Sequence, residues 1–211
     1  MTLLRLFLRS SYPIERMLAL TDGVYAIVLT LLVLDLKVPE VSGLTNTDLK
    51  TDLVAQIPNF IAYLVSFVLV AFFWMNHERL FAVTKRCDER MMVVNAVHLL
   101  TVSLVPYTAS LIGHYEGDRI AAMMFSANMG LASLTMVLLH GKVYAHPEWL
   151  TEQQDGHWIT MPWSVAYLGP ILGVMTMLVV LVSIEGALAL WFLLPIRNTW
   201  YRRAARNQSS A

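Results

Sequence analysis

Two ionisable side chains, Arg16 and Asp22, lie at the start of an apolar stretch of membrane-spanning length, residues 17–34. A charge inside a spanning helix costs about 2.5 to 3.5 kcal/mol on insertion scales, so it ordinarily faces protein or water and marks an ion pathway or a proton relay. On one helix these side chains point roughly 120° apart and lie about 9 Å apart along the axis, so they cannot pair with each other. Each therefore needs a partner on another helix.

Four polar side chains on the next two apolar stretches are candidate partners. Trp74 and His77 stand at the end of the second stretch, and Asn95 and His98 stand in the third. We expect them to form an interhelical network with the two charged side chains of the first stretch. A buried network of this kind can tie a bundle together, take part in transport, or do both, and the sequence leaves these alternatives open.

The first apolar stretch also carries a stripe of side chains along one face. At 100° per residue a narrow arc of the helix holds Arg16, Gly23, Ile27, Thr30 and Leu34. If this arc lined a symmetry axis, Ile27 and Leu34 would exclude water, and a ring of Thr30 hydroxyls would replace part of the hydration shell of an ion. Apolar residues at this spacing also form ordinary packing faces, so periodicity alone does not distinguish a pore lining from a helix contact.

The composition sets the class of protein. Hydrophobic residues make up 57% of the chain and charged residues 14%, and the mean hydropathy is +0.57, which predicts an integral membrane protein. The length of 211 residues leaves room for one helical bundle, a single domain over 1–211 with a disordered polar tail at about 204–211. The net charge of zero gives no basic excess for nucleic-acid binding. We find no nucleophile with a base, no phosphate-binding glycine loop and no metal-ligand cluster, so we expect neither an enzyme nor a bound cofactor.

Apolar stretches of about 20 residues predict four spans, near 15–37, 53–76, 91–113 and 120–140. The remaining apolar stretch, 162–196, is too long for one span and too short for two full-length ones. Its interruption at residues 183–186 predicts a hairpin whose second helix is short. The predicted fold is therefore all-α, with six transmembrane helices.

The distribution of basic residues favours six spans over five. With the N-terminus inside, six spans place most of the 15 Lys and Arg residues on the cytoplasmic side, as the positive-inside rule requires. Five spans would move the C-terminal arginines outside, namely Arg197, Arg202, Arg203 and Arg206. We expect a multi-pass protein of the cell membrane with both termini in the cytoplasm.

The segment Arg16-xxx-Leu20-Thr21-Asp22 resembles the Arg-xxx-Phe-Ser-Asp signature of the transmembrane protein 175 family, endosomal and lysosomal potassium channels with bacterial relatives. Leu20 replaces the aromatic residue of the signature, and Thr21 replaces its serine but keeps a hydroxyl. Further segments are similar to that family, at residues 23–27 (GVYAI), 34–39 (LDLKVP) and 73–79 (FWMNHER).

The resemblance implies a homotetramer of six-helix subunits in which the first helix of each subunit lines a central pore for potassium and other monovalent cations. It makes Ile27, Leu31 and Leu34 the apolar constriction and Thr30 the polar selectivity ring. The chain contains nothing like Thr-Val-Gly-Tyr-Gly, so such a channel would discriminate ions with side chains and not with a carbonyl filter. The stripe derived from periodicity contains three of these residues but leaves Leu31 off the axis.

A proton-coupled secondary transporter is the alternative function. In that case Asp22, His77 and His98 would form a proton relay within the bundle. Inverted repeats and broken helices are typical of such transporters, and the sequence shows neither.

Overall fold

The computed structural model describes residues 12–38, 46–150 and 167–196. The predicted tail at 204–211 and both chain termini lie outside these ranges. The described part is mainly helical and contains one short antiparallel strand pair, β1 (Tyr12–Pro13) with β2 (Arg86–Cys87). Its helices are α2 (Ile14–Leu31), η1 (Leu32–Asp35), α3 (Asn46–Ala55), α4 (Ile57–Ala82), α5 (Glu89–Ser103), α6 (Val105–His114), α7 (Arg119–Tyr144), η2 (Pro147–Trp149), α9 (Leu168–Val179) and α10 (Ile184–Leu190).

Within the described ranges, four helical segments are long and apolar enough to cross a membrane: Ile14–Asp35, Ile57–Ala82, Glu89–His114 and Arg119–Tyr144. Two shorter apolar helices follow, Leu168–Val179 and Ile184–Ile196. The prediction of four spans and a C-terminal helical hairpin is confirmed. The hairpin breaks where the sequence predicted, because the Ser183 hydroxyl caps α10 by accepting from the Gly186 N–H at 3.0 Å.

The second and third spans differ in detail from the prediction. Residues 46–55 form the separate helix α3, so the second span begins at Ile57 and ends at Ala82. The third span is divided into α5 and α6 at Leu104. Pro106 explains the division, because proline has no N–H to continue the helical hydrogen bonds.

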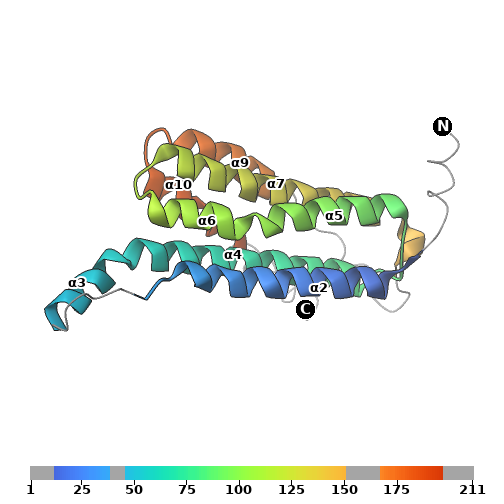
Figure 1. The fold of residues 1–211 in the computed structure, drawn as a ribbon. Helices are drawn as coiled ribbons and strands as arrows, with labels where there is room; N and C mark the ends of the chain where they lie inside the picture. The colour runs from blue at the N-terminus through green and yellow to red at the C-terminus, as the bar shows by residue number, and fades with distance from the viewer. Residues whose placement is uncertain (1–11, 39–45, 151–166, 197–211) are drawn as a thin grey trace, which may run out of the picture.

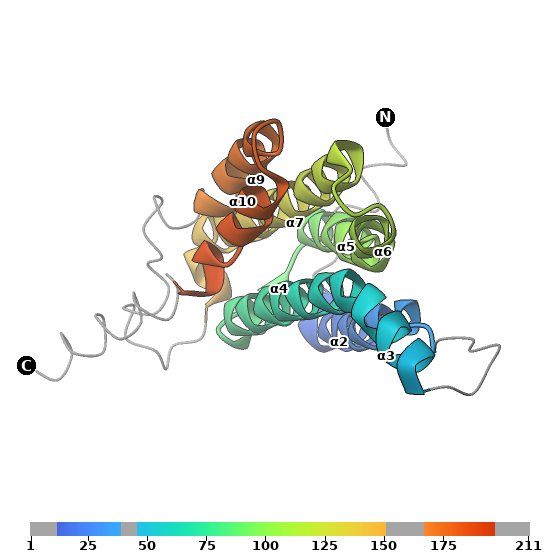
Figure 2. The same cartoon turned by 90° about the vertical axis from the view of Figure 1, so that its left-hand side faces the viewer.

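The helices form a bundle with α2 at its margin (Figures 1 and 2). Helix α2 packs against α4 and α5, while the α9–α10 hairpin packs on α7. The α6–α7 loop, the α9–α10 turn and α3 lie at the same end of the bundle, on the left in Figure 1.

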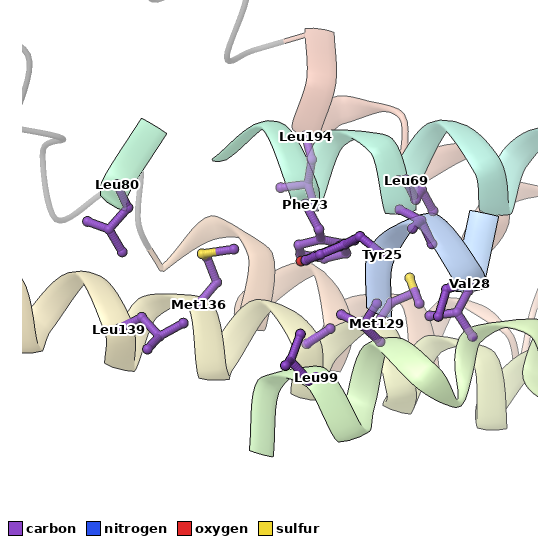
Figure 3. Packing of buried hydrophobic residues seen from close by; sticks show 14 of the residues in the cluster. Tyr25, Val28, Leu69, Phe73, Leu80, Leu99, Met129, Met136, Leu139 and Leu194 are labelled. Carbon is purple, nitrogen blue, oxygen red and sulfur yellow. The ribbon is translucent and has the colours of Figure 1, made fainter. Parts of the chain in front are cut away.

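Side chains from all the long helices meet in one buried core (Figure 3). Tyr25 and Val28 of α2 lie there beside Phe73 of α4, Leu99 of α5 and Met129 of α7, all at most 6% exposed. This core fixes the rotation of α2 about its axis and so decides which of its side chains stay outside.

Helices α7 and α9 approach each other so closely that their backbones are in contact. A Cβ added at Gly173 would lie 2.6 Å from the Gly130 Cα, and one at Gly169 would lie 2.6 Å from the Ser133 Cβ. Small residues permit this approach, which maximises dispersion contacts between helices in a membrane. The hairpin is thereby held on α7 within the subunit.

Candidate functional site

Helix α2 and η1 have one buried and one exposed face. The buried face includes Thr21, Tyr25, Val28 and Leu32. The opposite face, here called the exposed stripe, consists of Leu20, Gly23, Ile27, Thr30, Leu31 and Leu34. Its apolar side chains are 62% (Leu20), 58% (Ile27), 42% (Leu31) and 71% (Leu34) exposed in the subunit. The residues predicted for a pore therefore all lie among the α2 and η1 side chains that this subunit leaves uncovered.

The Thr30 hydroxyl is oriented by its own helix. Its Oγ1 donates to the carbonyl oxygens of Ile27, at 2.8 Å, and Ala26, at 3.1 Å. A hydroxyl has one proton and two lone pairs, and the backbone takes the proton. The oxygen of Thr30 is therefore left as an acceptor on the exposed stripe, which is the polarity that a cation requires.

The helix changes its winding within the exposed stripe, from α to 3₁₀ at Leu32. A 3₁₀ residue advances by about 120° instead of about 100°, so Leu34 lies within roughly 20° of Leu31 viewed down the axis, not about 60° away. The two leucines are thus eclipsed. An uninterrupted α-helix would place Leu31 about 60° from Leu34, which is why the stripe predicted from periodicity omits Leu31.

Three of the predicted residues form a buried hydrogen-bonded chain. The His77 Nε2 donates to the Asn95 Oδ1 at 2.7 Å, because that oxygen can only accept. The Asn95 Nδ2 donates to the Thr21 Oγ1 at 3.0 Å, and Thr21 donates to the Met17 carbonyl at 2.9 Å. All three side chains are at most 2% exposed. In each of these three hydrogen bonds a donor faces an acceptor.

A second buried chain passes through His98. The Thr135 hydroxyl donates to the carbonyls of Leu131 and Ala132, so its oxygen accepts from the His98 Nδ1 at 2.8 Å. The His98 Nε2 then accepts from the Tyr25 hydroxyl at 2.7 Å. The rings of His77 and His98 stack with centroids 5.9 Å apart, which places the two chains side by side.

Sequence reasoning missed Tyr25 and Thr135. Tyr25 follows Thr21 by one helical turn, so the two side chains lie on the same face of α2. Because the hydroxyl of a buried tyrosine needs a hydrogen-bond partner, this spacing could have predicted that Tyr25 belongs to the network. Thr135 stands in an apolar stretch with no such marker.

The charged residues of the signature lie apart from these chains. Asp22 is exposed, and its Oδ1 accepts from the Trp74 Nε1 of α4 at 3.1 Å. Arg16 is exposed too, and the structure does not join it to the network: it has no hydrogen bond or ion pair with another residue of the described ranges. It lies more than one helical turn before Asp22 on α2.

The geometry also bears on the proton relay proposed for a transporter. Within the described residues, no hydrogen bond connects Asp22 to His77 or His98, because Asp22 lies on the exposed side of α2 and both histidines are buried. No group of three His, Cys, Asp or Glu side chains in these ranges is arranged to hold a metal ion.

Comparison with known proteins shows which family the chain resembles. Residues 16–106 match the family model described as endosomal/lysosomal potassium channel TMEM175. A potassium channel of Streptomyces collinus is 34% identical over 131 residues, which are 62% of this chain and 63% of that protein. A potassium channel of Chamaesiphon minutus is 28% identical over 185 residues, or 86% and 91% of the two chains. The human endosomal/lysosomal proton channel TMEM175 is 24% identical over 139 residues, which are 27% of its length.

The fold is consistent with this resemblance. The crystal structure of a lysosomal potassium-selective channel TMEM175 homolog from Chamaesiphon minutus superposes with a TM-score of 0.76 at 26% identity, over 89% of this chain and 96% of the other. A variant of the potassium channel MtTMEM175, solved in complex with a nanobody fusion protein, has a TM-score of 0.55 at 17% identity and supports the fold alone. The family members are named as channels and not as enzymes. By its signature segment and its helical fold, the chain is similar to the TMEM175 family of channels.

Proposed function

We propose that four copies of this chain form a potassium-permeable channel of the cell membrane, with α2 of each copy lining a central pore and both termini in the cytoplasm. The observation that carries this proposal is the exposed stripe of α2. If the stripe faced lipid, the Thr30 hydroxyl oxygen and the Arg16 guanidinium on the same arc would meet hydrocarbon, where polar groups are costly. Around a common axis the same side chains meet water and each other.

Ile27, Leu31 and Leu34 form the constriction in this proposal. A ring of bulky apolar side chains excludes water and raises the barrier to a hydrated ion. The eclipsed pair Leu31 and Leu34 makes the dry segment longer than a single ring at Ile27 would.

Thr30 forms the selectivity ring in this proposal, between Ile27 and the leucine pair. Four hydroxyl oxygens supply acceptors to a partly dehydrated cation without the cost of burying a fixed charge. The backbone carbonyls of α2 are engaged in helical hydrogen bonds, so discrimination rests on side chains. Relatives named as potassium channels in two bacteria support potassium as the permeant ion. The vertebrate relatives are named as proton channels, so proton flux is measured separately.

The test is ion flux into liposomes under potassium, sodium and proton gradients. Ile27→Asn wets the constriction and should raise potassium flux severalfold, and Thr30→Val, which keeps the shape of the side chain but removes its oxygen, should reduce the preference for potassium over sodium. Val33→Asn is the matched control, since Val33 is 45% exposed on another face of η1. The proposal fails if the wild-type protein conducts no cation, or if the Val33 variant changes flux as much as the Ile27 variant.

The proton-coupled transporter remains the second candidate, and the stacked pair His77 and His98 beside α2 is the observation in its favour. In a transporter an imposed pH gradient drives potassium or substrate uphill, whereas in a channel potassium moves only down its own gradient. Uphill movement that His98→Phe abolishes would establish the transporter.

A further inference from the structure

A cavity of about 330 Å³ lies between α4, α6, α7 and α10, away from the exposed stripe of α2. Its walls are mostly apolar, with Ile61 and Val65 from α4, Phe125 from α7, and Leu188 and Phe192 from the α10 side. This volume falls in the range of small-molecule sites, about 300 to 1,000 Å³. The cavity reaches the end of the bundle that carries the α6–α7 loop and the α9–α10 turn, which faces the viewer in Figure 2.

The mouth of this cavity is acidic. Glu116 and Asp118 of the α6–α7 loop and Glu185 at the start of α10 line it, and no Lys or Arg is among its lining residues. The Asp118 Oδ1 caps α7, and the Glu185 Oε2 accepts from the Ser183 hydroxyl, so each keeps a second oxygen for a ligand. Three carboxylates at one opening attract a cation and repel a phosphate.

The depth of the cavity contains a polar group without a partner. Ser66 of α4 lines the cavity and is 1% exposed, and its Oγ has no hydrogen-bond partner in the described part of the chain. Ser66 follows Pro58, at the mouth, by eight positions, or roughly 12 Å along the helix. A buried hydroxyl left unpaired is costly, so a ligand oxygen at this depth would gain a hydrogen bond that the subunit does not provide.

From these three features we infer a ligand site for an elongated hydrophobic amine that carries a hydrogen-bonding oxygen at its far end. The ammonium lies among Glu116, Asp118 and Glu185, the apolar middle fills the cavity, and the oxygen pairs with Ser66. The site is separate from the proposed pore, and its occupation does not depend on ion conduction.

Calorimetric titration of the full-length protein in phosphatidylcholine nanodiscs tests the site, with empty nanodiscs subtracted. The probes are 8-amino-1-octanol, octylamine and 1,8-octanediol, which differ only in their end groups. The amino alcohol should bind roughly three- to tenfold more tightly than octylamine, which lacks the oxygen, and than the diol, which lacks the charge.

Variants test which residues bind the oxygen end of the ligand and which bind its ammonium end. Ser66→Ala should abolish the tighter binding of 8-amino-1-octanol relative to octylamine but keep its tighter binding relative to 1,8-octanediol. The double variant Glu116→Gln with Glu185→Gln should abolish the tighter binding relative to the diol but keep that relative to octylamine. Ala189→Phe fills the cavity from an exposed position and should abolish binding, whereas Leu193→Phe, exposed on the same segment but not lining the cavity, should leave it unchanged. Equal affinity for all three probes, or binding that survives Ala189→Phe, would show simple membrane partitioning and overturn the inference.

Discussion

At the scale of single residues, the polar groups of the first helix serve two different environments. Thr21 and Tyr25 face inward and complete hydrogen-bonded chains with Asn95 and His98. Thr30 faces outward and gives its proton to the backbone. The sequence supplied the residue types for both sets, but which side chains meet depends on the rotation of α2 against the core, and local spacing does not encode that rotation.

Asn95 is the residue on which the Thr21 and His77 side chains both depend. Asn95→Ala leaves the His77 Nε2 proton and a lone pair of Thr21 without partners in a buried site, so the free energy of unfolding should fall by about 1 to 3 kcal/mol. Thermal unfolding in detergent measures this as a lowered Tm. Ser103→Ala is the control, because the exposed Ser103 hydroxyl bonds only the Leu100 carbonyl of its own helix. Equal Tm values for the two variants would contradict a stabilising role for the chain.

At the scale of elements, hydropathy predicted the spans because membrane-crossing length and apolar composition are local properties. It did not predict that α3 separates from α4, or that the third span divides at Leu104, because neither break changes the average hydropathy of the stretch. The close contact of α7 with α9 also escaped prediction. Gly169 and Gly173 have the spacing of a small-residue packing face, but their partners Gly130 and Ser133 follow only from the fold.

The contact between Gly130 and Gly173 makes the α9–α10 hairpin sensitive to single methyl groups. Gly173→Val should force α9 from α7, since its Cβ would meet backbone that cannot move aside, and overpacking of this kind costs about 1 to 3 kcal/mol. We expect a lower Tm and faster proteolysis after the α7 segment. Gly141→Val is the matched control on α7, where an added Cβ meets nothing within 4 Å. A stable Gly173 variant would show that the helices are free to separate.

At the scale of the whole molecule, the proposed function requires several copies of the chain to assemble. The subunit has a complete core, and α2 at its margin leaves the exposed stripe uncovered. A symmetric ring is the arrangement in which every copy of the stripe meets an equivalent one. No property of a single chain fixes the number of copies, so the tetramer rests on the family resemblance.

Cysteine crosslinking tests the ring directly. Ile27→Cys should give covalent dimers on mild oxidation, from a particle whose mass by light scattering equals four subunits. Wild-type protein, whose cysteine is Cys87, is the control. Burial, together with the nearby Asp88 and Glu15 charges, raises the pKa of the Cys87 thiol. Little reactive thiolate is therefore present at pH 7 to 8, and crosslinking of the wild-type protein should increase only at higher pH. Val182→Cys, at an 89% exposed position in the α9–α10 turn, should crosslink weakly. If the Val182 variant formed more covalent dimer than the Ile27 variant, a helix other than α2 would lie at the axis.

The separation of the two faces of α2 has an evolutionary consequence. Ile27, Thr30 and Leu34 contribute little to the buried core of the subunit, so exchanging them leaves the folding of each copy nearly unaffected. In the proposed channel, selection can therefore act on ion preference without first compensating for lost stability, whereas Tyr25 or Asn95 cannot drift in this way. Descendants of one ancestral subunit are free to diverge in the ion they pass while keeping the same scaffold.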